Sequence, residues 1–225
     1  MSDPNFPSND IESSSSASIH AHSIGEAWLA ISNLIMRDGM ESHYDGLAMR
    51  EVMMATLCVA EPRASDDIIR KYADGGRMAW MHDNFSDHAV VEALGNADSY
   101  ATRLRDYAHS GRDQIRWVSQ RLLDDPTTRS ATITTFQPLS DTTYIPCVSL
   151  LDFFLVDGRL ELAVYAHSID FGAKGFANLV ELASLQEEVA RTLQAPLGPL
   201  TMIIKSAHIY DSDVEYMRGV LTERY

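Results

Sequence analysis

Apolar residues recur along the chain with spacings that predict both helices and strands. Residues 24–36 and 113–123 place apolar side chains three or four positions apart, which is typical of amphipathic helices. A longer stripe over residues 179–193 stops before a proline and a glycine, so a third helix is expected there. A short fourth helix is expected over residues 211–221. Each helix has one apolar face, and that face needs a partner layer to cover it.

Runs of apolar and β-branched residues predict that layer. Residues 52–60 form an apolar run that ends at a Glu-Pro pair, which favours a buried strand. Residues 145–156 and 160–167 are separated by Asp157-Gly158, a dipeptide typical of a hairpin turn. The other predicted strands are residues 130–136 and 200–204.

This order of elements, without an internal repeat, predicts one α+β domain over residues 23–225, a mixed twisted β-sheet backed by helices. Residues 63–100 show no clean period, and we expect short helices there. Residues 1–22 are rich in Ser, Asn, Asp and Pro, which predicts a disordered N-terminal tail. The tail holds His20 and His22, and two histidines without further ligands do not predict a metal site.

Composition narrows the class of protein. A chain of 225 residues with 45% hydrophobic and 22% charged residues is typical of a globular domain. Its 18 basic and 32 acidic residues give a net charge of −14, which disfavours nucleic acid and anionic lipid as partners. No apolar run is long enough to span a bilayer, and no secretory signal is visible, so we expect a cytoplasmic protein. Its two cysteines cannot form a disulfide framework.

Cys147 is the strongest candidate for chemistry. It follows Pro146 and opens an apolar strand directly after the polar loop 137–143, where a substrate could reach its thiol. The alternative is a buried structural cysteine, because free cysteines are among the most buried residues. Cys58, inside an apolar run, is most simply explained as core packing.

Several separated motifs resemble those of thymidylate synthases. The segment from Tyr144 to Leu162 is similar to the family's nucleophile strand and hairpin, in which a Pro-Cys pair opens a strand that ends in Asp-Gly. The family's Arg-Ser-x-Asp, Asn and His-x-Tyr motifs have counterparts in the same order and at the same intervals: 167–170, Asn178 and 208–210. The resemblance covers about residues 100–221 and implies a thymidylate synthase-like fold.

The resemblance implies a chemistry centred on Cys147, whose thiolate would attack C6 of a pyrimidine nucleotide. C5 would then accept a one-carbon group from 5,10-methylenetetrahydrofolate. His167 stands where the family has an arginine beside the thiol, and it could supply a positive charge or act as a base when its pKa allows. Asn178 matches the residue that hydrogen-bonds the pyrimidine edge, which favours uracil over cytosine. A simple helix-capping role for Asn178 is the alternative.

The resemblance also assigns the sugar, the phosphate and the cofactor. His208 and Tyr210 would hold the sugar hydroxyl, and Ser168 would bind the phosphate. Asp170 would bind the pterin ring of the folate and take part in catalysis. Arg129 would be a phosphate ligand donated across a homodimer interface. The family's Glu-Leu-Leu-Trp segment has no recognisable counterpart, and Trp80 is the candidate that stands in for its cofactor contact, with Asp83 and Glu92 as other stand-ins.

Departures from the family pattern leave three functions open. His167, and Ser130 in place of a second arginine, remove two cations from the phosphate site. The family's proton-relay Glu has no recognisable counterpart, and the sequence shows no match to the family's C-terminal segment that closes over the folate. Because hydride transfer needs a closed, dry site, hydroxymethylation is expected to be a rival of methylation. The chain is therefore predicted to be a methyl- or hydroxymethyltransferase; a pathway-specific relative acting on a non-phosphorylated heterocycle; or a non-catalytic nucleotide-binding homologue.

Overall fold

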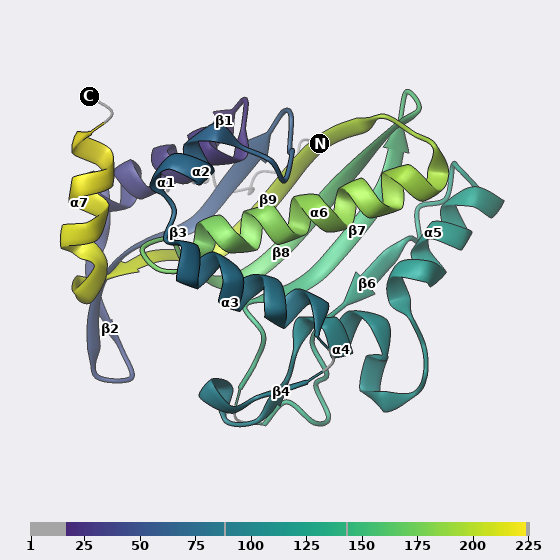
Figure 1. Cartoon of the computed structure of the whole chain (residues 1–225), viewed down its shortest axis with the longest axis horizontal. Coiled ribbons are helices and arrows are strands. Elements are labelled where there is room, and N and C mark those ends of the chain that lie inside the picture. The colour runs from purple at the N-terminus through teal and green to yellow at the C-terminus, as the bar shows by residue number, and fades with distance from the viewer. Residues whose placement is uncertain (1–16, 88, 143, 224–225) are drawn as a thin grey trace, which may run out of the picture.

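The computed structural model describes residues 17–87, 89–142 and 144–223, and a seven-stranded sheet runs through its centre (Figure 1). In chain order its elements are β1 (Ser18–Ala21), α1 (Ile24–Asp38), β2 (Met40–Tyr44), β3 (Leu47–Val59), α2 (Asp67–Tyr72), α3 (Gly75–Ser86), β4 (Val90–Val91), η1 (Glu92–Leu94), β5 (Ala97–Asp98), α4 (Tyr100–Arg105), η2 (Tyr107–His109), α5 (Gln114–Asp124), β6 (Thr132–Thr134), β7 (Val148–Val156), β8 (Arg159–Asp170), α6 (Gly175–Leu193), β9 (Leu197–Tyr210), η3 (Asp211–Asp213) and α7 (Val214–Thr222).

The large sheet is mixed. Its strand order is β1-β3-β9-β8-β7-β6, and β2 pairs with β3 as a hairpin. The pairs β1/β3 and β8/β9 are parallel, and the other pairs of this sheet are antiparallel. Because β8 and β9 are parallel neighbours, the chain returns between them through α6, a βαβ crossover. Strands β4 and β5 form a separate small hairpin.

The core lies between one face of this sheet and the helices α1 and α6. Both helices contact β9 and each other, and α3 packs against α6 (Figure 1). Trp28, Phe153 and Phe176 are fully buried there, and Trp28 lies 4.8 Å from Phe176 between ring centroids. The indole nitrogen of Trp28 also donates to the carbonyl of Phe171 at 3.0 Å. The first helix is thereby tied to the turn that follows β8.

Short polar side chains begin the helices. Ser23 accepts from the backbone of Glu26 at the start of α1, and Asp113 accepts from that of Arg116 at the start of α5. The carboxylate of Asp66 accepts from three backbone N–H groups, two in α2 and that of Gly25 in α1. A Cβ atom at Gly25 would lie 2.4 Å from Asp66, so this helix–helix contact requires glycine.

The predicted fold class, an α+β sheet backed by helices in a single domain, is confirmed. One boundary was wrong: residues 18–21, placed in the predicted tail, form β1 and pair in parallel with β3. Residues 1–16 of that predicted tail lie outside the described residues. The helix predicted from residue 179 begins four residues earlier, at Gly175. The sequence pattern did not show this start, because Gly175 and Asn178 interrupt the apolar stripe of the first turn.

Candidate active site

The candidate residues gather at one end of the sheet, where β8 and β9 both finish. Asp170 and His208 are direct partners in the parallel ladder, and the N–H of Phe171 donates to the carbonyl of His208 at 2.8 Å. The nucleophile candidate, Cys147, directly precedes the neighbouring strand β7, and its carbonyl accepts the N–H of His167 in β8 at 3.0 Å. Residues more than 60 positions apart in sequence thus meet at one edge.

Cys147 is a free, partly exposed cysteine directly before β7. Burial raises the pKa of its thiol above the usual value, the positive charge of Lys174 lowers it, and the negative charge of Asp170 raises it again. A hydrogen bond with the side chain of Tyr144 also lowers this pKa. The thiol is therefore desolvated, and its ionisation depends on the charges beside it.

Two tyrosines near Cys147 were missed by sequence reasoning. The hydroxyl of Tyr100 is buried and accepts the N–H of Val148 at 3.0 Å, one residue after the thiol. Burial, followed by the charge of Cys147, raises the pKa of Tyr100 well above its usual value, and the same two causes raise that of Tyr144. Both phenols are therefore neutral donors at ordinary pH. No local pattern distinguishes them from core tyrosines.

Asp170 lies in a tight turn between β8 and α6. One carboxylate oxygen, Oδ1, accepts the N–H groups of Gly172 at 3.0 Å and Ala173 at 3.2 Å. Burial and the charge of Asp213 nevertheless raise the pKa of Asp170 to about 6. Gly172 allows this turn, since a Cβ atom there would lie 2.8 Å from Asp213. The carboxyl group can therefore exchange a proton near neutral pH.

Asn178 lies in the first turn of α6 and is buried. Its Nδ2 donates to the carbonyl of Lys174 at 3.1 Å, while its Oδ1 is buried without a hydrogen-bond partner among the described residues. The position before the helix is held by Lys174, so Asn178 does not cap it. An unpaired buried acceptor costs free energy unless a ligand satisfies it.

His208 and Tyr210 are brought together on β9. Their rings meet edge to face with centroids 5.0 Å apart, and His208 is 4% exposed. Behind them Ser206 donates to Glu51 at 2.7 Å, and its hydroxyl lies 3.5 Å from Nδ1 of His208. Burial lowers the pKa of His208, so its ring is neutral at physiological pH.

His167 and Ser168 lie in the last part of β8, but the His167 ring turns to Ser149, whose hydroxyl lies 3.3 Å from its Nδ1. Burial and the nearby positive charge of Lys205 lower the pKa of His167. His167 is therefore neutral at pH 7 and does not supply the positive charge that an arginine would. Ser168 is half-buried, opposite Ser206 of β9.

The last two candidates have different surroundings. Trp80 on α3 lies beside the cluster, because the ammonium group of Lys174 is 4.1 Å from the centroid of its ring. Arg129 is exposed, three residues before β6, and β6 pairs with the middle of β7. Cys147 lies at the start of β7, so Arg129 is separated from the cluster within one chain. Apart from Arg129, the candidates lie at or beside this end of the sheet, but the His167 ring faces Ser149.

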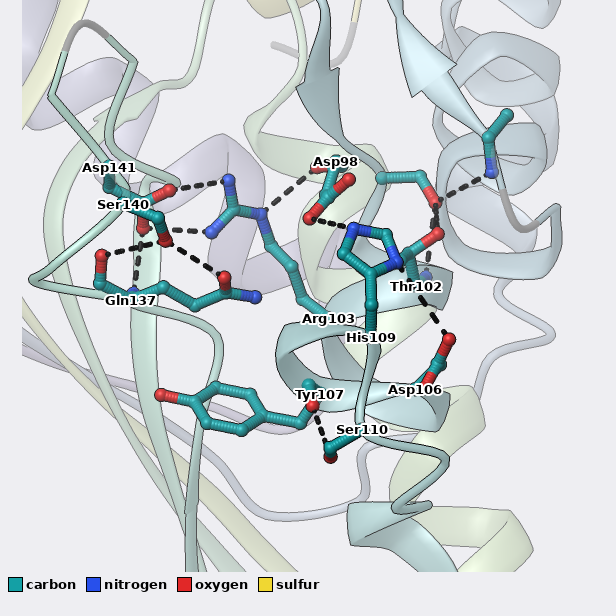
Figure 2. Close-up of polar contacts among 12 residues, drawn as sticks. Asp98, Thr102, Arg103, Asp106, Tyr107, His109, Ser110, Gln137, Ser140 and Asp141 are labelled. Atoms are coloured by element: carbon teal, nitrogen blue, oxygen red, sulfur yellow. Dashed lines mark hydrogen bonds and ion pairs between the residues drawn. The ribbon is translucent and has the colours of Figure 1, made fainter.

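A buried ion pair holds the loop that leads to Cys147. Figure 2 shows the guanidinium of Arg103 facing the carboxylate of Asp141. Two hydrogen bonds join them, each 2.8 Å long. Their side chains are only 3% and 6% exposed. A cavity of about 260 Å³ lies between this loop and the β4–β5 hairpin, and Tyr144 borders it.

Within the described part of the chain, no three His, Cys, Asp or Glu residues gather as a metal site, and no helix is long and apolar enough to cross a membrane.

Fold and site together define a class of protein: an α+β domain with a desolvated thiol, a titratable carboxyl and a buried amide oxygen at one end of its sheet, the last without a hydrogen-bond partner in the described part of the chain. Comparison with known proteins agrees with the family that the sequence motifs resemble. The thymidylate synthase family pattern matches residues 63–225. A "putative thymidylate synthase" of Methanosarcina barkeri is 31% identical over 211 residues, covering 90% of this chain and 94% of the relative. One of the same description from Methanothermobacter thermautotrophicus is 30% identical, covering 91% and 98%.

A deoxyuridylate hydroxymethyltransferase of Bacillus phage SP01 is 35% identical over 144 residues, covering 57% of this chain and 36% of the phage protein. The family pattern spans more than half of the chain, and the archaeal relatives match over almost their whole length. The chain belongs to the thymidylate synthase family. The resemblance drawn from the motifs around Cys147 is thereby confirmed.

Proposed function

We propose that this protein transfers a one-carbon group from 5,10-methylenetetrahydrofolate to C5 of a pyrimidine nucleotide through a covalent adduct at Cys147. The observation that carries the proposal is the buried Oδ1 of Asn178, which has no hydrogen-bond partner among the described residues. Asn178 donates to the carbonyl of Lys174, whose charge, like that of Asp170, acts on the Cys147 thiol. A buried acceptor and a nucleophile at the same end of a sheet suit a flat ring that has an N–H on one edge and an electrophilic carbon on another.

The roles of the chain's residues follow from this arrangement. The Cys147 thiolate would form a bond to C6, and the displaced electron pair would make C5 nucleophilic. The folate, when bound, supplies the one-carbon unit. After C5 has gained that unit, loss of its proton and breakage of the C–N bond to the folate would leave a methylene group on C5. A hydride from the folate, or water, would add to that methylene as the thiolate departs, which restores the 5,6 double bond. The hydroxyls of Tyr100 and Tyr144 and the carboxyl of Asp170 are nearby groups able to relay a proton.

Asn178 supports uracil as the base. Its Nδ2 is held by the carbonyl of Lys174, which leaves Oδ1 to accept the N3–H of uracil and the second amide hydrogen to reach O4. Cytosine has an acceptor at N3 and would leave Oδ1 unpaired at that edge. His208 and Tyr210 would hold the sugar hydroxyl, and Ser206 and Glu51 would hold His208.

The cofactor assignment fits the residues present. Asp170 uses Oδ1 for its own turn, so Oδ2 can accept from the pterin ring. Trp80 lies on the same side, joined to the turn through Lys174. Methylation and hydroxymethylation both use this arrangement, and similarity to the phage hydroxymethyltransferase keeps the second as a specific alternative. We also propose a reducing cytoplasm, where the thiol stays free.

We further propose a homodimer formed through the sheet face opposite the helices. Leu150, Tyr165 and Ile203 are direct neighbours on β7, β8 and β9, and they are 38%, 37% and 43% exposed. An exposed apolar stripe on the central strands is typical of an interface. Arg129 is separated from Cys147 within one chain, so its proposed phosphate contact is with the partner's nucleotide.

Release of tritium from C5-labelled UMP, dUMP, CMP or dCMP in the presence of the folate tests the reaction. We expect release with a uracil nucleotide and none with Cys147→Ala, whereas Cys58→Ser retains the activity. Product mass distinguishes a methyl from a hydroxymethyl group. A thermal-shift panel of bases, nucleosides and nucleotides tests the alternative of a non-phosphorylated heterocycle, because only a phosphate-binding site prefers the monophosphate. Failure to release tritium from all four nucleotides would contradict the proposal.

A further inference from the structure

Lys174 connects several residues of the proposed active site. It is the residue directly before α6, and its N–H donates to the carbonyl of Asp170 at 3.0 Å. Its own carbonyl accepts from Nδ2 of Asn178 at 3.1 Å. Its ammonium group lies 4.1 Å from the centroid of the Trp80 ring. Lys174 is therefore fixed by three residues that have proposed roles in the reaction.

The thiol needs a positive charge, because the thiolate is the nucleophile and burial disfavours it. The titratable groups that act on Cys147 or feel its charge are Lys174, Asp170, Tyr100, Tyr144 and Tyr210. Asp170 and the tyrosines are neutral or negative. His167, at the position of the family's arginine, has a lowered pKa and faces Ser149. Lys174 is the one cation in this set.

We propose that Lys174, held over the Trp80 ring between Asp170 and Asn178, supplies the positive charge that stabilises the Cys147 thiolate in place of the missing arginine. The ring matters because an aromatic face attracts a cation without neutralising it. In a direct ion pair with Asp170, the carboxylate would neutralise the ammonium charge, and less of that charge would act on Cys147. The proton lost by the thiol passes to solvent, and no group changes its oxidation state.

This inference rests on the proposed function, because the thiolate is needed only for the proposed reaction. The first measurement that tests it needs no substrate. Lys174 acts through Cys147, so it is a positioning residue, and the pH dependence of thiol reactivity reports its role directly. The rate of alkylation by iodoacetamide follows the fraction of thiolate. The full chain with Cys58→Ser leaves Cys147 as the only cysteine, so its alkylation can be followed by intact mass between pH 6 and 10.

In that background we expect Lys174→Gln to move the reactivity profile of Cys147 upward by about one pH unit, which is about a tenfold slower alkylation at pH 7. Lys174→Arg keeps the charge and should retain the profile of the parent. Lys205→Gln is the matched control, because Lys205 is an exposed lysine whose charge acts on His167. It should leave the Cys147 profile unchanged.

A Cys147 profile that is the same in the parent and in Lys174→Gln would overturn the inference. Trp80→Leu provides a second variant if Lys174→Gln does not fold, since it leaves the lysine and removes the ring beneath it. We expect Trp80→Leu also to slow alkylation at pH 7, and an unchanged rate would count against the role. A shifted profile without tritium release from any nucleotide would overturn the proposed function and support the Lys174 inference.

Discussion

Asp170 shows at the scale of one residue how a fold sets the chemistry of a side chain. Its carboxylate accepts two backbone N–H groups, which favour the charged form, yet burial and the charge of Asp213 outweigh them and raise the pKa to about 6. An ordinary aspartate would be fully ionised at pH 6. A group that titrates there can both bind the cofactor as a carboxylate and donate a proton.

The raised pKa of Asp170 has a consequence for stability. The unfolded chain ionises this group near 3.8 and the folded chain near 6, so the folded state loses stability as the pH rises through that window. Asp170→Asn cannot ionise. We therefore expect its stability relative to the parent to increase between pH 4 and pH 6 and to stay level above pH 7. Thermal unfolding of both proteins across this range is the measurement, and a constant difference at every pH would contradict the assignment.

At the scale of elements, the loop before Cys147 is positioned by a buried pair from distant segments. Arg103 of α4 reaches Asp141 with two hydrogen bonds and also bonds the carbonyl of Thr135, as Figure 2 shows in part. Removing one partner of a buried pair leaves the other charge desolvated and unpaired. The path of residues 136–142, and with it the place of Tyr144 beside the thiol, depends on this pair.

Arg103→Met should therefore lower the free energy of unfolding by about 3–5 kcal/mol. The double variant Arg103→Met with Asp141→Leu should regain much of that loss, because it removes both buried charges. Arg218→Met is a matched control, since Arg218 pairs with Glu215 on an exposed helix surface and such pairs contribute about 0–1 kcal/mol. Denaturant unfolding measures all three. Equal losses in the Arg103 and Arg218 variants would show that the loop is not held in this way.

Elements with a strong local pattern could be predicted from the sequence. The stripe over residues 24–36 became α1, and Asp157-Gly158 became the turn between β7 and β8, with both residues at positive φ. β1 was missed because it has four residues and exists only by pairing with β3, which no local pattern encodes. Lys174 was missed for a related reason: its aromatic partner is 94 positions away, and a cation over a distant ring leaves no periodic signal.

At the scale of the whole molecule, the chain leaves its central strands uncovered on one side. The helices α1 and α6 bury one face of the sheet, while Leu150, Tyr165 and Ile203 remain exposed on the other. Burying this stripe against a second copy would remove apolar surface from water, at about 25 cal/mol per Å². The proposed role of Arg129, remote from Cys147 in its own chain, depends on this assembly.

Tyr165→Glu tests this assembly, because a charge at the centre of the stripe cannot be buried against an identical copy without a partner. We expect sedimentation at micromolar concentration to show a dimer for the parent and a monomer for the variant. Trp117→Glu is the control: Trp117 is 50% exposed on α5, away from the stripe, and this change should keep the dimer. A parent protein that sediments as a monomer would remove the proposed role of Arg129.

The central claim is that the sulfur of Cys147 adds to a pyrimidine ring, and a mechanism-based nucleotide tests it most directly. Incubation with 5-fluoro-dUMP and 5,10-methylenetetrahydrofolate should raise the intact mass by the sum of nucleotide and folate, because fluorine at C5 cannot leave as a proton does. Peptide mapping should place the added mass on Cys147, and Cys147→Ala should gain none. A folded protein that binds these compounds without any covalent increase in mass would contradict the account.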